Sequence, residues 1–330
     1  MASLSFIEII LKEIAVSQVK AKYAFFNGKI VPIEEAKISV MTHAFNYGTG
    51  VFGGMRGYWN DDEEQLFVFR PHEHFERLKH SAAFLRINIP YSIEELTAIL
   101  TELLRTEGYR ENCYARPIAY KSSEMIGVRL SDIEDAFTIF AIPFGSYVAD
   151  EEGTHVHFSA WRRIDDNAIP ARGKITGAYA NSALIKADAL LAGYDEALVL
   201  NNDGHVSEAS AANVFIVRKG VLYTPPVQSN VLEGIVRRSM MVIAREELGL
   251  EVVERDIDRT EVYMADEVFL CGTGVQMVAV TRVEHRPIGS GQIGPITRDL
   301  RRLFFDIVTG RVAKYRHWLS PVYAKEKVNA

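Results

Sequence analysis

A single lysine set among small residues is the first feature of this sequence that suggests chemistry. Lys174 stands between Gly173 and Gly177, and Tyr179 follows it at a spacing of five. Glycines let a flat ligand lie against the backbone, a lysine amine can form a Schiff base, and a nearby phenol can hydrogen-bond the same ligand. Most Gly-Lys pairs are exposed loop corners, so this stretch predicts a site only in combination with others.

A carboxylate and two groups of backbone amides offer further contacts to such a ligand. Glu208 lies among small and apolar residues, where a carboxylate shielded from water would favour a protonated pyridine nitrogen; an exposed edge strand is the alternative interpretation. Gly234, Ile235 and Val236 begin a helix whose first amides are free to bind phosphate, as at any helix start. The turn at Thr273 predicts either a plain turn or an anion site.

Strands and helices that could position these residues follow from periodicity and turn signals. Asn27-Gly28 between apolar runs predicts a β-hairpin, and a strand at 113–120 places Tyr114 and Arg116 on one face. Arg70 lies at a strand-to-helix corner, where an anion-binding arginine and a surface cap are equally expected. Helices are predicted over 71–87, 92–108, 179–191, 234–248 and 295–309, and antiparallel hairpins dominate the second half.

The length of 330 residues predicts two domains that share a cleft. Residues 144–153 contain turn formers and acids without periodicity, which places the domain boundary there. We therefore expect an N-terminal extension over 1–22, a small α/β domain over 23–145, an interdomain loop over 146–154 and a larger domain over 155–330.

Composition disfavours several classes of protein. With 48% hydrophobic and 24% charged residues, the chain has the profile of a globular protein, and its net charge of -6 argues against a nucleic-acid partner. Residues 1–19 lack the charge order of a secretion signal and the length of a membrane span, so no membrane association is expected. The histidines show no metal-ligand spacing, and no Gly-x-Ser-x-Gly elbow indicates a hydrolase. Cys113 and Cys271 are the only cysteines, too few for a disulfide framework, which fits a reducing cytoplasm.

Taken together, the motifs resemble the fold-type IV pyridoxal phosphate enzymes, and among them the branched-chain amino acid aminotransferases. The likeness covers residues 23–320 and depends on the order and spacing of separate motifs. These are Tyr47-Gly48 through Phe52-Gly53-Gly54 and Arg56, Phe69-Arg70, Tyr114-Ala115-Arg116-Pro117, Lys174 with Tyr179, Ser207-Glu208 through Asn213-Val214-Phe215, Leu232 with Gly234-Ile235, Cys271-Gly272-Thr273, and Gly294-Pro295-Ile296-Thr297.

The resemblance implies a fold of α+β or α/β type, like that of D-amino acid aminotransferase. A small N-terminal α/β sandwich would precede a larger β-barrel-like domain with flanking helices. The cofactor would be pyridoxal 5'-phosphate, joined to Lys174 as a Schiff base, with Tyr179 on its ring oxygen, Glu208 on its ring nitrogen and Leu232 on a ring face. Its phosphate would be held by Arg70, Gly234, Ile235, Val236 and Thr273.

The implied reaction is transamination of leucine, isoleucine or valine with 2-oxoglutarate, giving 2-oxo acids and L-glutamate by a ping-pong mechanism. Lys174 would serve as general base and acid. Arg116, beside Tyr114, would meet the γ-carboxylate of glutamate. The other residues expected to bind substrate are Tyr47, Phe52, Gly54, Arg56, Thr273, Gly274 and Val275.

Family resemblance also implies a homodimer in which the partner's loop completes each pocket. In this chain the loop would carry Met125, Val128 and Arg129. Gly53 replaces an acid found in many relatives, Val236 replaces a common threonine, and Arg129 is a further cation in this loop. The additional arginine and the roomier pair Gly53-Gly54 make a broader range, including D-amino acids or (R)-amines, an alternative. From another class, a non-catalytic, cofactor-carrying homodimer also fits these motifs.

Overall fold

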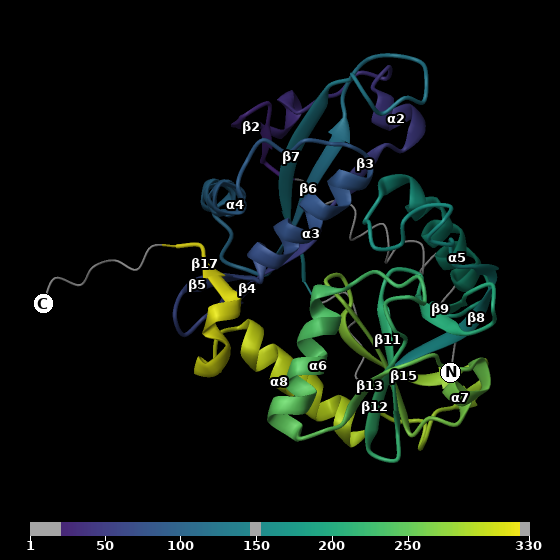
Figure 1. The fold of residues 1–330 in the computed structure, drawn as a ribbon. Coiled ribbons are helices and arrows are strands. Elements are labelled where there is room, and N and C mark those ends of the chain that lie inside the picture. Colours follow the sequence, from purple (N-terminus) through teal and green to yellow (C-terminus); the bar gives the residue numbers. More distant parts are fainter. Residues whose placement is uncertain (1–20, 146–152, 324–330) are drawn as a thin grey trace, which may run out of the picture.

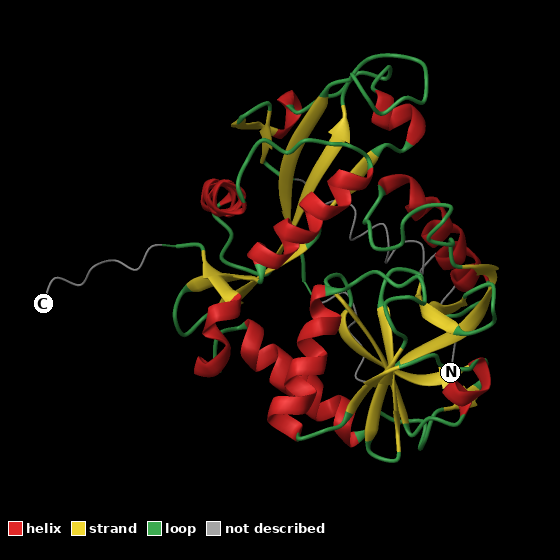
Figure 2. Ribbon diagram, in the orientation of Figure 1, coloured by secondary structure: helices red, strands yellow, loops and turns green. Residues whose placement is uncertain are grey.

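A computed structural model of the protein describes residues 21–145 and 153–323, which form two β-sheets with helices between and around them (Figures 1 and 2). In the first sheet the order is β17-β5-β4-β6-β7-β1-β2, with β3 also paired to β6, and every pairing is antiparallel. Its strands are β1 (Tyr23–Phe26), β2 (Lys29–Pro32), β3 (Gly50–Phe52), β4 (Met55–Asn60), β5 (Gln65–Phe69), β6 (Cys113–Lys121), β7 (Asp135–Pro143) and β17 (Leu319–Pro321).

Two amphipathic helices, α3 (Pro71–Phe84) and α4 (Ile93–Glu107), pack on this first sheet (Figure 1). The predicted capping box begins α4: the Ser92 hydroxyl accepts from the Glu95 amide, and the Glu95 carboxylate accepts from the Ser92 amide. Helix α3 ends three residues before the expected position, since the chain turns away after Phe84. The short elements η1 (Ile33–Glu35) and α2 (His43–Tyr47) lie in the connections.

The second sheet is mixed, in the order β10-β9-β8-β15-β14-β11-β12-β13, with β16 also paired to β15. Helices α5 (Tyr179–Leu191) and α6 (Ile235–Leu248) each connect two parallel neighbours, β8 to β9 and β12 to β13. These crossovers explain why the expected dominance of antiparallel hairpins is incomplete. The strands are β8 (Thr154–Arg162), β9 (Glu196–Leu200), β10 (Val206–Ala209), β11 (Asn213–Arg218), β12 (Val221–Thr224), β13 (Val252–Glu254), β14 (Glu267–Gly272), β15 (Gln276–Val283) and β16 (Arg286–Pro287).

Helices α6 and α8 (Pro295–Val308) join the two sheets through a common core (Figure 1). This core combines Met240 and Phe304 from the helices with Phe69 of the first sheet and Phe215 of the second. A separate core, which includes Val156, covers the other face of the second sheet. The remaining elements are η2 (Thr176–Ala178), α7 (Arg259–Tyr263) and η3 (Ala313–Trp318).

The C-terminal part of the chain returns to the first sheet. After α8 and η3, β17 pairs antiparallel with β5, so these residues differ from the expected assignment of 155–330 to the second domain. Backbone pairing to β5 decides this, and the sequence carries no signal for such a long-range partner. Of the expected interdomain loop 146–154, residues 146–152 lie outside the described part of the chain, and Thr154 already belongs to β8.

Candidate active site

A cavity of about 670 Å³ lies where the two sheets meet, and most of the predicted site residues line it. Its volume falls within the range of small-molecule sites in proteins. The predicted residues that line it are Phe52, Gly54, Tyr114, Arg116, Lys174, Tyr179, Glu208, Leu232, Gly234, Ile235, Val236, Thr273, Gly274 and Val275. Residues far apart in the sequence therefore converge on one cavity.

Backbone contacts with the first domain hold Lys174 at this junction. Its amide donates to the Ser81 hydroxyl at 3.1 Å, and its carbonyl accepts from the Phe52 amide at 3.0 Å. The Gly177 amide donates to the Gly48 carbonyl at 3.1 Å, and a Cβ on Gly48 would approach Gly177 Cα to 2.8 Å. These two glycines thus permit close backbone packing between domains, whereas the sequence suggested room for a ligand.

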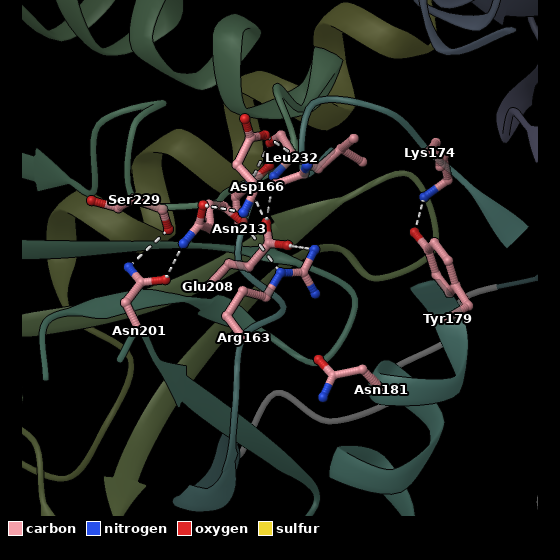
Figure 3. A network of polar contacts seen from close by, with 12 residues as sticks. Arg163, Asp166, Lys174, Tyr179, Asn181, Asn201, Glu208, Asn213, Ser229 and Leu232 are labelled. Carbon is pink, nitrogen blue, oxygen red and sulfur yellow. Dashed lines mark hydrogen bonds and ion pairs between the residues drawn. The ribbon is translucent and has the colours of Figure 1, made fainter. Parts of the chain in front are cut away.

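The Lys174 amine faces the Tyr179 hydroxyl, with which it forms a direct hydrogen bond (Figure 3). Burial, together with the neighbouring Arg77 guanidinium, lowers the pKa of Lys174 to about 7. Burial and the Glu208 carboxylate raise the pKa of Tyr179 to about 12, so the phenol keeps its proton near neutral pH. A partly uncharged amine beside a phenol donor suits attack on a carbonyl carbon.

Glu208, on β10, is 3% exposed and has polar partners at both oxygens. Arg163 contacts Oε1 at 2.6 Å, and Oε2 accepts from Asn213 Nδ2 at 2.8 Å and from the Leu232 amide at 3.1 Å (Figure 3). Burial raises the pKa of this carboxyl, while Arg163 opposes the shift. The interpretation as an exposed edge glutamate is therefore wrong, because Glu208 is buried at the cavity wall.

The start of α6 supplies free amides to the cavity, and the turn after β14 also lines it. Gly234 is the N-cap of α6 without a side-chain cap, so the amides of Ile235 and Val236 remain available at the positive end of the helix. A Cβ on Gly234 would meet Asn213 Oδ1 at 2.1 Å, which explains the glycine at this position. The Thr273 turn lies on the same cavity. This arrangement suits a phosphate group.

Arg70 does not line the cavity. Its Nε donates to Glu73 at 2.7 Å, its Nη1 donates to Ser239 at 2.8 Å, and its guanidinium lies 4.7 Å from the Trp318 ring. As the N-cap of α3 it has a positive φ of 48°, and its side chain is engaged by its own helix and by α6. The expected placement of Arg70 at the phosphate is therefore not matched by the structure.

Arg77, seven residues further along α3, lines the cavity instead. Its Nη1 donates to the Glu233 carbonyl at 3.0 Å, directly before the start of α6, and burial lowers its pKa to about 10. The sequence analysis missed this residue. No local signal in the sequence marks it, because its place at the cavity depends on which side of α3 faces the second domain.

The predicted substrate pair, Tyr114 and Arg116, also lines the cavity. Arg116 Nη2 donates to the Tyr114 hydroxyl at 2.9 Å, which confirms that both side chains share a face of β6, and its guanidinium lies 4.5 Å from the Phe52 ring. Gly54 is required beside this pair, because a Cβ there would meet the Tyr114 hydroxyl at 2.1 Å. Arg56 is buried next to the cavity, donating to the Gly145 carbonyl at 2.8 Å and the Gly274 carbonyl at 3.4 Å.

Besides Arg56, four predicted substrate residues do not line the cavity of this single chain: Tyr47, Met125, Val128 and Arg129. The Tyr47 hydroxyl accepts from the Gly127 amide at 3.0 Å, which ties α2 to the loop that carries the other three. Val128 is 77% exposed. Within one chain, these residues form an outer edge of the first domain instead of a pocket wall.

Comparison with known proteins identifies the family. The family model for amino-transferase class IV matches residues 50–283. The chain belongs to this family. A probable branched-chain-amino-acid aminotransferase of Aquifex aeolicus is 47% identical over 92% of this chain and 97% of the relative.

Solved structures of the family agree with the fold. The branched-chain aminotransferase of the thermophilic archaeon Thermoproteus uzoniensis, solved with norvaline, has a TM-score of 0.88 at 40% identity, covering 92% of this chain and 100% of that one. The enzyme from Thermobaculum terrenum in its PLP form has a TM-score of 0.89 at 38% identity over 93% and 100%. The expected fold type IV is confirmed, with an antiparallel first sheet, a mixed and curled second sheet, and helices flanking both.

Neither a metal site nor a membrane span is found in the described part of the chain. Within 21–145 and 153–323, no group of three or more His, Cys, Asp or Glu side chains is arranged to hold a metal ion. None of the helices in these ranges is long and apolar enough to cross a bilayer.

Proposed function

We propose that this class IV aminotransferase is a branched-chain amino acid aminotransferase that uses pyridoxal 5'-phosphate. It transfers the amino group of leucine, isoleucine or valine to 2-oxoglutarate in a ping-pong cycle. One observation carries the proposal: Lys174, with a pKa of about 7, shares a cavity with a buried carboxylate and an uncapped helix start.

The cavity fits the cofactor in its chemistry. Glu208 is a buried acceptor for a ring nitrogen, Tyr179 is a phenol donor for a ring oxygen, and Leu232 supplies an apolar side chain between them. Arg77, with the amides of Ile235 and Val236 and with Thr273, would hold the phosphate. When bound, the cofactor withdraws electrons from the bonds at the substrate Cα.

Lys174 is the residue that moves the proton of the reaction. Near pH 7 its amine is uncharged in roughly half of the molecules, so it can take a proton from the substrate Cα and return one. Tyr179 contacts the same amine and keeps it directed into the cavity. Burial of both groups limits competition from water.

Arg116 and Tyr114 let one pocket accept two kinds of side chain. Phe52 offers an apolar surface beside Lys174, with the amine 4.8 Å from its ring centroid. Arg116, stacked near the same ring, provides a cation for the γ-carboxylate of 2-oxoglutarate. We propose that the Gly274 and Val275 amides bind the α-carboxylate, with Arg56 supporting the turn through the Gly274 carbonyl.

A homodimer is proposed as the working form, in the cytoplasm. Large apolar side chains gather on α2 and the adjacent loops of the first domain: Ile38, Val40, Met41, Phe45, Ile126 and Val128 are all at least half exposed. An apolar group of this kind suits burial against another protein surface. A second copy of the chain would cover it and bring Met125, Val128 and Arg129 to the neighbouring cavity. Cys113 and Cys271 are both free and buried, in keeping with a reducing compartment.

The test is a substrate panel on the purified, cofactor-loaded protein. Leucine, isoleucine and valine with 2-oxoglutarate should give L-glutamate, with parallel lines in double-reciprocal plots. D-alanine and (R)-1-phenylethylamine should react far more slowly. Faster turnover of either would favour the broader-range alternative, and a protein that binds the cofactor without converting any amine would favour the non-catalytic carrier.

A further inference from the structure

An arginine that the reaction scheme does not use forms an ion pair with Glu208. Arg163 follows β8 directly and reaches Glu208 Oε1 at 2.6 Å. Its side chain is 15% exposed and that of Glu208 is 4% exposed. Arg163 also lines the cavity, although it belongs to none of the predicted contacts with the cofactor or the substrate.

The position of Arg163 is fixed by a network that leads away from the cavity (Figure 3). Its Nε donates to the Asn230 carbonyl at 3.2 Å, and Asn230 Nδ2 donates to Asn201 Oδ1 at 3.1 Å. Asn201 Nδ2 then donates to the Ser229 carbonyl at 2.9 Å. The guanidinium is thus held against the carboxylate by one backbone acceptor, the Asn230 carbonyl, and the Asn230 side chain is itself hydrogen-bonded, which distinguishes this pair from a mobile surface ion pair.

Charge balance around Glu208 depends mainly on this contact. Burial favours the protonated carboxyl, and Arg163 is the largest opposing charge, followed by the smaller effects of Lys174 and Arg237. The titratable and charged groups that act on or feel this carboxylate are Arg163, Lys174, Arg237, Arg77, Tyr179 and Cys271. Lys174 must give up its own charge for the proposed reaction, and Arg237 is paired with Glu254 at 2.7 Å.

We propose that Arg163 is a positioning residue that keeps Glu208 ionised and thereby keeps the proton of the Glu208–cofactor contact on the ring nitrogen. This inference rests on the proposed function. With Arg163 replaced by a neutral side chain, the Glu208 carboxylate becomes a stronger base than the ring nitrogen of the cofactor and takes the proton. The ring nitrogen then loses its charge and withdraws electrons less strongly, although no contact to the cofactor has been removed.

The first test uses the protein without cofactor and compares Arg163→Gln with wild type. Loss of Arg163 raises the folded-state pKa of Glu208 further above its value in the unfolded chain. When the pKa of a carboxyl group is higher in the folded than in the unfolded chain, the free energy of unfolding falls as the pH rises from the unfolded-state pKa to the folded-state pKa. We expect the melting temperature of Arg163→Gln to fall roughly 5–10 °C below that of wild type at pH 8, and the gap to narrow at pH 5.

The second test reads the ring nitrogen directly in the loaded protein. With cofactor labelled by 15N in the ring, wild type and Arg163→Lys should show the chemical shift of a protonated nitrogen at pH 7.5. Arg163→Gln should show the shift of an unprotonated nitrogen. Lysine keeps the charge but not the fork of the guanidinium, so it separates charge from geometry.

Arg218→Gln is the matched control, because Arg218 pairs with Glu261 at 2.8 Å outside the cavity. It should leave the nitrogen signal unchanged and show no extra loss of stability at pH 8. An equal loss for Arg163→Gln at every pH, or a nitrogen that stays protonated in it, would overturn the proposal. If Arg163→Gln does not fold, the Arg163→Lys variant decides: an unprotonated ring nitrogen in a stable Arg163→Lys protein would overturn the proposal. A protein that binds no cofactor would refute the proposed function, while the cofactor-free melting curves would still decide the role of Arg163.

Discussion

Two variants, Arg77→Gln and its control Arg70→Gln, test which of these two arginines binds the cofactor phosphate. Arg70 is the N-cap of α3 and Arg77 lies in the middle of the same helix, and the sequence alone favoured Arg70. Arg77 lines the cavity beside the first turn of α6, whereas Arg70 is engaged by Glu73 and Ser239. Each substitution removes one positive charge from α3, but only the Arg77 guanidinium lines the cavity.

The expected magnitude follows from the loss of one charged hydrogen-bonding partner. Hydrogen bonds to charged groups contribute about 1.5–3 kcal/mol, so Arg77→Gln should increase the dissociation constant of the cofactor roughly 10- to 150-fold. Arg70→Gln should change that constant by less than about threefold. Because Arg77 is the largest charge that lowers the pKa of Lys174, Arg77→Gln should also raise this pKa above about 7.

Cofactor affinity is measured by equilibrium dialysis or by titration of the cofactor-free protein at constant ionic strength. Melting temperatures of both variants serve as the check on folding. Weaker binding in Arg70→Gln with normal binding in Arg77→Gln would refute the assignment. Equal losses in both, with intact folds, would show that the phosphate responds to the overall positive potential of α3 and not to a specific contact.

Three further predictions follow from the same cavity. The rate at which the cofactor-free protein captures pyridoxal 5'-phosphate should rise with pH through about 7 and level off near pH 8, since the uncharged Lys174 amine is the reactive form; a flat stopped-flow profile would contradict the lowered pKa. Tyr179→Phe should reduce kcat by about tenfold or more while the melting temperature changes little, because the phenyl ring can keep the packing on Phe52, whose centroid is 4.6 Å away; an unchanged kcat would remove Tyr179 from the reaction. Gly234→Ala should lower stability by about 1–3 kcal/mol and weaken cofactor binding, since the new Cβ would meet Asn213 Oδ1 at 2.1 Å, whereas Gly145→Ala, where a Cβ meets nothing within 4 Å, should behave as wild type in urea unfolding.

Local signals in the sequence predicted much of the fold. The capping box at Ser92 and Glu95, the Asn27-Gly28 hairpin and the end of α5 at Leu191 all depend on neighbouring residues, and the structure has each of them. The glycines at 48, 50, 53, 54 and 57 fit either a flexible loop or backbone close to a ligand, and the sequence does not decide between them; in the structure this segment forms α2, β3 and β4. Strand β15 was not predicted, although its apolar residues 277–280 are buried.

Long-range pairing decided the features that the sequence could not predict. β17 pairs with β5 across most of the chain, which no local pattern records. The choice between Arg70 and Arg77 depends on which side of α3 faces the second domain, and the partner of Glu208 depends on where β8 ends. Lys174 and Glu208 were found because small residues surround them, while Arg163 stands between an arginine and an isoleucine with no comparable signal.

The central claim is that the amine of Lys174 carries the cofactor. Borohydride reduction of the loaded protein, followed by proteolysis and mass spectrometry, measures this directly. The account predicts a phosphopyridoxyl group on the peptide that contains Lys174, and no labelling in a folded Lys174→Ala protein. A label on Lys186, which also lines the cavity, or on any other lysine, would contradict it.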